Sequence, residues 1–180
     1  MVLARRAALP AALLLVLLAG SLAGCTVFER RGTLAVSLTV ANDGALNDFR
    51  VLNLSLDKVK LEARSLSPDP IPSQVQKLEL VREARDAGTE TLFKQEVRAD
   101  TYNRITVTTP PGQTFQGILQ DGTKVAVLVP NNALSAITAF DVPRGGTVDY
   151  LLTLRVDKVN LGVGQANYQV TVDPEASHPK

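Results

Sequence analysis

The clearest strand signal in this 180-residue chain is the run Thr33-Leu34-Ala35-Val36-Ser37-Leu38-Thr39-Val40. Its large apolar side chains occupy every second position, and successive side chains of an extended chain point to opposite faces. Leucine and valine therefore share one face, and small or hydroxyl-bearing residues share the other. This period of two predicts a half-buried β-strand.

The same alternation recurs further along the chain. Thr147–Val156 repeats it, and Phe115–Leu119 and Thr123–Val129 flank the tripeptide Gln120-Asp121-Gly122. Asp-Gly between two alternating runs is a strong hairpin signal, because its residues accept the backbone geometry of a tight turn. We expect three valines of the second strand to face inward, namely Val125, Val127 and Val129.

Weaker strand patterns cover residues 75–81, 92–97, 102–108, 137–142 and 168–172. All the patterns together predict an all-β fold of about eight to ten short strands, arranged as a single antiparallel β-sandwich over residues 33–172. Helical spacing of apolar residues occurs only in Leu80–Gly88, so we expect at most one short helix.

Prolines and glycines mark the connections. Ser67–Pro72 holds three prolines, which lack a backbone donor, and we expect a surface crossover there. Thr109–Gly112 and Pro143–Gly146 have the composition of turns. The polar segment 173–180 is expected to be a frayed, disordered tail.

One internal similarity joins Leu54–Leu61 to Leu154–Leu161, which share the pattern apolar, x, apolar, Asp-Lys-Val, x, Leu. In both, the alternation slips by one residue across Asp-Lys, and such a slip turns the strand face over unless a bulge absorbs it. We expect a bulge or bend at Asp57-Lys58 and at Asp157-Lys158. Two interpretations stay open: a paired acidic site, or two bulged strands with solvated charges.

The first residues form a separate segment. Arg5-Arg6 precede an apolar run that is short and contains Pro10, which is typical of a signal peptide rather than a membrane span. The order Leu22-Ala23-Gly24-Cys25 resembles the lipobox of bacterial lipoproteins. That resemblance implies a signal peptide over residues 1–24, cleavage before Cys25, and attachment of diacylglycerol and further fatty acid, such as palmitate, to Cys25.

Cys25 is the only cysteine of the chain, and lipidation explains an otherwise unpaired thiol in an exported protein. Residues 25–32 would form the tether, whose reach is at most roughly 25 Å. The membrane is therefore the first expected partner. Thr26 stands where an aspartate would resemble an inner-membrane retention signal, so we expect the bacterial cell envelope, and the outer membrane in a Gram-negative cell.

Charge and composition exclude several classes of function. Removal of residues 1–24 takes Arg5 and Arg6 from 19 basic residues, against 18 acidic ones, so the net charge falls to about −1. Such a chain lacks the clustered basic face that nucleic acid needs, and nucleic acid is not an expected partner.

Residues for familiar catalytic chemistry are scarce. The only histidine is His178, in the polar tail, so Cys-His and Ser-His-Asp arrangements and histidine-rich zinc sites are not expected. Gly162-Val163-Gly164 is an isolated glycine pair without a following helix, which does not make a nucleotide site. No catalytic, cofactor-binding or metal residue is assigned, and no cofactor is expected.

The loop Asn42–Asp48 holds four oxygen-bearing side chains, which are ligands that calcium prefers. It lacks the alternating acidic spacing of an EF-hand. Asn, Asp and Gly are also the residues that a turn requires for its own backbone, and the turn is the favoured interpretation.

The body of the chain resembles a domain-of-unknown-function family of secreted bacterial lipoproteins. Four clusters carry the resemblance: Gly32–Thr39, Leu52–Leu61, Ala99–Ile105 and Phe140–Thr147. The chain departs from the family pattern at Val40-Ala41-Asn42 and at Asp100. The resemblance implies a β-sandwich of the transthyretin or immunoglobulin kind and no catalytic residue.

Three functions follow as hypotheses. The first is a non-catalytic binding or structural module of the cell envelope that contacts a protein or glycan. The second is a calcium-dependent adhesin or glycan-binding module. The third is a hydrolase that uses two carboxylates, which no spacing in the sequence selects.

Overall fold

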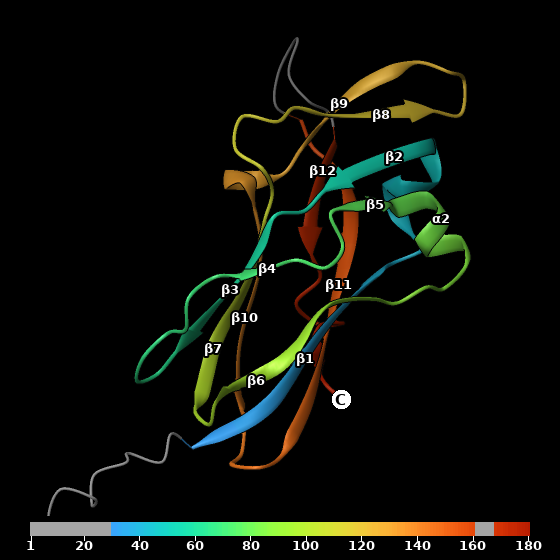
Figure 1. The fold of residues 1–180 in the computed structure, drawn as a ribbon. Coiled ribbons are helices and arrows are strands. Elements are labelled where there is room, and N and C mark those ends of the chain that lie inside the picture. Colours follow the sequence, from blue (N-terminus) through green and yellow to red (C-terminus); the bar gives the residue numbers. More distant parts are fainter. Residues whose placement is uncertain (1–29, 161–167) are drawn as a thin grey trace, which may run out of the picture.

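The computed structural model describes residues 30–160 and 168–180 (Figure 1). Within these ranges the chain is all-β with a single short α-helix, α2 (Leu80–Arg85), and two 3-10 turns, η1 (Gly44–Asp48) and η2 (Pro130–Asn132). No helix there is long and apolar enough to cross a membrane.

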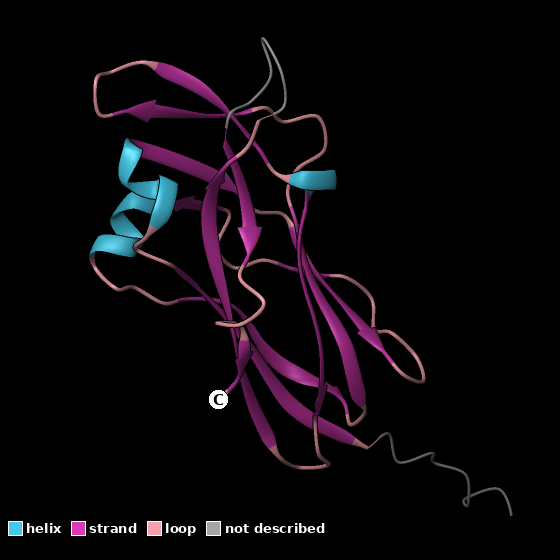
Figure 2. Ribbon diagram, turned by 180° about the vertical axis from the view of Figure 1, so that it is seen from behind, coloured by secondary structure: helices cyan, strands magenta, loops and turns pink. Residues whose placement is uncertain are grey.

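The strands form two sheets. The larger has nine strands in the order β5-β2-β8-β9-β12-β11-β1-β6, with β13 beside β11, and the smaller has the order β10-β7-β3-β4. The larger sheet curls strongly (Figure 2). Its strands are β1 (Arg31–Val40), β2 (Phe49–Ser55), β5 (Lys77–Glu79), β6 (Glu90–Arg98), β8 (Phe115–Leu119), β9 (Lys124–Leu128), β11 (Thr147–Lys158), β12 (Tyr168–Val172) and β13 (His178–Pro179). The smaller sheet holds β3 (Lys58–Ala63), β4 (Ile71–Pro72), β7 (Thr101–Thr108) and β10 (Ala133–Asp141).

The expected plain antiparallel sandwich is wrong. β1 pairs with β11 in parallel, from Thr33 opposite Thr147 to Val40 opposite Leu154, and β12 pairs with β9 in parallel. A period of two fixes which residues share a face, but it is the same for a parallel and an antiparallel neighbour. The larger sheet is therefore mixed, and the smaller one alone is antiparallel.

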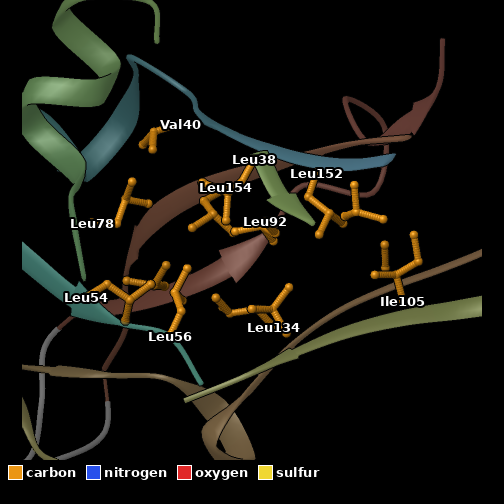
Figure 3. Packing of buried hydrophobic residues seen from close by; sticks show 14 of the residues in the cluster. Leu38, Val40, Leu54, Leu56, Leu78, Leu92, Ile105, Leu134, Leu152 and Leu154 are labelled. Carbon is orange, nitrogen blue, oxygen red and sulfur yellow. The ribbon is translucent and has the colours of Figure 1, made fainter. Parts of the chain in front are cut away.

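The core lies between the two sheets. Figure 3 shows Leu38, Leu152 and Leu154 of the larger sheet on the side that faces Ile105 and Leu134 of the smaller one. The alternation in β1 and β11 places one face of each strand in this cluster. At one end of the core, Phe140 packs between Tyr102 and Tyr150, with ring centroids 5.6 Å and 4.9 Å away.

The hairpin and most weaker strands are confirmed. β8 and β9 pair as antiparallel neighbours, and Gly122 has φ +88°, a backbone conformation that favours glycine. Val127 and Val129 are buried and Val125 is half-buried. Only the pattern over 75–81 shrinks, to the three residues of β5, because the helix α2 begins at Leu80.

The helix α2 replaces the last two residues of that pattern. The side chain of Glu79 accepts hydrogen bonds from the backbone N–H groups of Val81 and Arg82, at 3.3 and 2.6 Å. These donors would otherwise lack partners at the start of the helix. Leu80 and Ala84 are buried, so one face of α2 covers the end of the larger sheet.

The bend predicted at Asp57-Lys58 is present. β2 belongs to the larger sheet and β3 to the smaller one, so the chain changes sheets over Leu56 and Asp57. The backbone N–H of Asp57 already donates to the carbonyl of Thr108 in β7, at 2.8 Å. Both Leu56 and Val59 remain buried because the change of sheet absorbs the slip in alternation.

The bulge predicted at Asp157-Lys158 is wrong. β11 and β12 pair without a break from Leu154 opposite Val172 to Lys158 opposite Tyr168. Val156 is the last fully buried residue of β11, and Val159 is only half-buried, so nothing forces the strand to turn over. The two similar segments are therefore not equivalent in the structure.

The disordered tail expected at 173–180 is also wrong. β13 pairs with Tyr150 and Leu151, and the backbone N–H of Lys180 donates to the carbonyl of Asp149 at 2.7 Å. β12 covers β11 only from Leu154 onward, which leaves the N–H of Thr153 without a strand partner. The Ser177 hydroxyl accepts from it at 2.9 Å, and a buried donor needs such a partner.

Candidate functional site

A hollow lies where the β8–β9 hairpin meets the end of β11 and the beginning of β12. Its volume is about 500 Å³. A second hollow of about 340 Å³ shares three of its walls. The described residues that line the first are Leu119, Val125, Lys158, Val159, Asn160 and Tyr168.

Packing beneath the hairpin shapes this end of the sheet. The ring of Phe49 lies against Gly117 of β8, where a Cβ would overlap Cε1 of that ring. β9 joins β12 through only two residue pairs, at Tyr168 and Gln169. The hairpin therefore pairs with β2 over more residues than with β12. This short pairing with β12 leaves room between the hairpin and the end of β11.

Three polar side chains from distant segments meet beside the hollow. Lys158 Nζ lies 2.7 Å from Oδ2 of Asp48, and the hydroxyl of Tyr168 donates to the same oxygen at 2.9 Å. Asp48 ends η1, Lys158 ends β11, and Tyr168 begins β12. The lysine and tyrosine are direct partners in the β11–β12 ladder, so the strands themselves set their spacing.

The Asp48 carboxylate is held in its ionised form. The hydrogen bond from Lys158 lowers the pKa of Asp48, burial opposes this, and the Tyr168 hydroxyl adds to the lowering. The hydrogen bond with Asp48 raises the pKa of Lys158. Burial, and then the Asp48 carboxylate, raise the pKa of Tyr168. At neutral pH the cluster therefore holds one anion, one cation and one neutral hydroxyl.

Tyr168 forms a wall of the hollow rather than an exposed platform. Tyr168 is 8% exposed. Its ring packs edge to face against the ring of Phe49, with the two ring centroids 4.7 Å apart. Lys158 Nζ lies 5.9 Å from the centroid of the tyrosine ring, within the range of a cation–π interaction. Lysine and tyrosine therefore stabilise each other as well as Asp48.

The calcium hypothesis concerns the same loop. Residues 44–48 form η1, and the backbone N–H of Leu46 donates to the carbonyl of Asp43, which is what the turn interpretation requires. Asp48 already has a cation, Lys158, on Oδ2. Over residues 30–160 and 168–180, no group of three or more histidine, cysteine, aspartate or glutamate side chains gathers in a way that could hold a metal.

Other sequence candidates lie elsewhere. Asp57 has Lys58 at 4.0 Å, and Asp157 contacts Arg155 and Thr171, so each acid of the similar segments has its own local partners. His178 is exposed, with Nδ1 3.0 Å from the carbonyl oxygen of Ala176. Cys25 and Gly162-Val163-Gly164 fall outside the described residues.

The contact among Asp48, Lys158 and Tyr168 was missed in the sequence. Asp48 belongs to the loop of the calcium hypothesis, Lys158 to the internal similarity, and Tyr168 to the start of a weakly patterned strand. Asp48 and Tyr168 are 120 residues apart, and no local spacing links them. The sequence offers one weak signal: Asp48 directly precedes Phe49, the buried aromatic residue that begins β2.

Comparisons of the chain with protein-family models, with curated proteins and with solved structures found no match. The resemblance to secreted lipoproteins therefore stays a prediction that rests on the residues themselves.

Proposed function

We propose that this chain is a lipid-anchored binding module of the bacterial cell envelope, that it is not an enzyme, and that it binds an envelope protein at the hollow beside Lys158. The observation that carries the proposal is the position of the hollow relative to the tether. β1 starts at Arg31, beside the beginning of β11, whereas Lys158 is the last residue of β11.

The distance between the two ends follows from strand geometry. β11 runs over 12 residues, and a strand rises about 3.3 Å per residue, so the hollow lies roughly 35 Å from the beginning of β11. A lipid on Cys25 would hold the other end of the domain at the bilayer. The hollow would then face away from the membrane, where a partner can reach it.

The composition of the hollow favours a protein partner over a glycan. Leu119, Val125 and Val159 supply aliphatic walls, and Lys158 and Tyr168 supply polar groups at one side. A mostly apolar pocket with a few placed polar groups suits an apolar side chain with a polar neighbour. Sugar rings usually stack on exposed aromatic faces, and the Tyr168 ring is packed against Phe49.

The ionisation of the site supports binding rather than hydrolysis. A carboxylic acid that donates a proton near neutral pH needs a raised pKa. The hydrogen bond from Lys158 shifts the pKa of Asp48 in the opposite direction. The ionised Asp48 instead holds Lys158 and Tyr168, which line the hollow, in fixed positions. This role suits a binding site.

Site-specific photo-crosslinking in intact bacteria tests the proposal. A photoreactive residue replaces Val125 in the hollow, and a matched control carries it at Lys60, exposed on β3 of the smaller sheet. We expect one discrete protein adduct from position 125 that position 60 does not give, and its loss when Leu119→Glu places a charge in the same wall. Equal labelling from both positions, or none, would overturn the proposal.

A further inference from the structure

Five arginines gather at the end of the domain where β1 begins. Arg31 and Arg98 are direct partners in the β1–β6 ladder. The backbone carbonyl of Arg30 accepts from Ala99 at 2.6 Å, and that of Arg31 accepts from Gly145 at 2.7 Å. These contacts bring together the start of β1, the β6–β7 turn and the β10–β11 turn (Figure 1).

We call this set the tether-end surface: Arg30, Arg31, Arg64, Arg98 and Arg144. All five residues are exposed, and Arg64 joins the set because its backbone N–H donates to the carbonyl of Thr101 at 2.8 Å. They are half of the ten arginines that follow Cys25 in the sequence. The nearly neutral net charge of the chain therefore conceals a local excess of positive charge.

Acidic groups at this end are fewer and are engaged in its turns. The Asp100 carboxylate accepts from the hydroxyl and the backbone N–H of Ser65 and from the N–H of Thr101. Asp141 accepts from the Thr101 hydroxyl at 2.6 Å. Glu96 and Asp149 lie further along their strands, opposite Thr33 and Ala35. Among the described residues of these turns, five arginines stand against two aspartates, and Glu29 precedes Arg30 in the sequence, so the tip carries an excess of about two positive charges.

An exposed apolar side chain lies in the same region. Leu66 is 66% exposed and follows Ser65, which is fixed to Asp100. An apolar side chain beside arginines is the combination that settles into the boundary between lipid headgroups and acyl chains. Arginine also matches phosphate with two parallel hydrogen bonds, so it suits phospholipid headgroups in particular.

We propose that the tether-end surface docks directly onto an anionic phospholipid bilayer. Charge complementarity supports this partner, and so does the position of the tether, an argument that rests on the lipid attachment proposed above. The docking does not depend on the fatty acid, and it orients the domain so that the hollow beside Lys158 points away from the membrane. The lipid keeps the domain near the bilayer, and the arginines set the orientation of the domain on the bilayer surface.

Vesicle sedimentation tests the proposal without the lipid anchor. The chain from Thr26 to Lys180 keeps the whole buried core, which runs from Leu34 to Val170. It is mixed with vesicles of phosphatidylcholine alone or with about one third phosphatidylglycerol. We expect binding to the anionic vesicles only, and weaker binding at about 0.5 M salt, where the Debye length falls below that at 0.1 M.

Charge variants then locate the surface. Each basic residue near an anionic bilayer contributes about fivefold in affinity, so Arg98→Gln with Arg144→Gln should weaken binding about 25-fold. Arg50→Gln with Arg85→Gln removes the same charge from β2 and α2, far from the tether, and should change binding less than twofold. Leu66→Ser should weaken binding without any change in charge.

Several results would overturn the proposal. They are equal binding to neutral vesicles, no binding to anionic ones, or equal losses in the two double variants. Thermal unfolding verifies that each variant is folded. If the first double variant is unstable, Arg144→Gln alone, in an exposed turn, should still lose about fivefold, and an unchanged affinity would contradict the docking.

Discussion

The Tyr168 hydroxyl donates to Oδ2 of Asp48 at 2.9 Å, and this bond joins segments 120 residues apart. It fixes the loop before β2 to the first residue of β12. Lys158 completes the contact from the neighbouring strand. The end of the larger sheet is therefore held by a polar cluster on its surface as well as by its core.

Tyr168→Phe should remove this bond and keep the ring against Phe49. A hydrogen bond to a charged group contributes about 1.5–3 kcal/mol, whereas loss of the whole ring in Tyr168→Ala should cost about 3–5 kcal/mol. Urea unfolding of the two variants measures both values. Equal losses would mean that the hydroxyl, rather than the ring, carries the stabilisation.

Asp48→Asn should change how stability depends on pH. The pKa of Asp48 is lowered in the folded protein, chiefly by Lys158, so its contribution is present above the unfolded pKa and is lost as pH falls through the folded pKa. The difference in unfolding free energy between the wild type and Asp48→Asn should be largest above about pH 4 and shrink as the pH falls through the lowered pKa. Chemical denaturation across this range would show a constant difference if the interpretation is wrong.

Gly117→Ala should destabilise the hairpin end of the core. The new Cβ would overlap the ring of Phe49, and overpacking of a filled core typically costs about 1–3 kcal/mol. Phe49→Leu relieves the overlap, so the double variant should lose less stability than the sum of the single variants. Additive losses in a double-mutant cycle would rule out this contact as the cause.

Ser177→Ala should leave the buried backbone N–H of Thr153 without an acceptor. The expected cost is about 1–3 kcal/mol in the free energy of unfolding. His178→Ala is the matched control, because its side chain is exposed on the following residue. Denaturant midpoints compare the two, and an equal, small effect would mean that the final segment contributes little.

Cys25→Ser should prevent lipid attachment. We expect an uncleaved precursor in membranes and no incorporation of labelled fatty acid. The wild type, with Arg50→Gln as a second control, should label normally. A Cys25→Ser protein that is cleaved and labelled like the wild type would refute the lipobox interpretation.

Local pattern predicted the strands, because burial on one face imposes alternation wherever a strand lies over a core. Thr33–Val40, the hairpin around Asp121-Gly122 and residues 168–172 all follow this rule. The direction of a neighbouring strand leaves no such trace in local sequence. The parallel pairing of β1 with β11 was missed for that reason.

The two Asp-Lys-Val segments show where local similarity fails. Leu56 lies where the chain leaves one sheet for the other, whereas Val156 remains paired with Val170. Long-range strand pairing decides whether the chain bends at the aspartate, although the residues around each aspartate are alike. The polar cluster at Asp48 was missed in the same way, since its members meet only after the sheet has formed.

The parallel ladder between β1 and β11 has a mechanical consequence. A pull between the start of β1 and the far end of β11 would act along both strands. The eight residue pairs from Thr33–Thr147 to Val40–Leu154 would then be loaded together in shear, rather than opened one after another like a zipper. Tension of the kind that the proposed anchor and the proposed partner would apply at opposite ends of the domain would therefore be shared by the whole ladder.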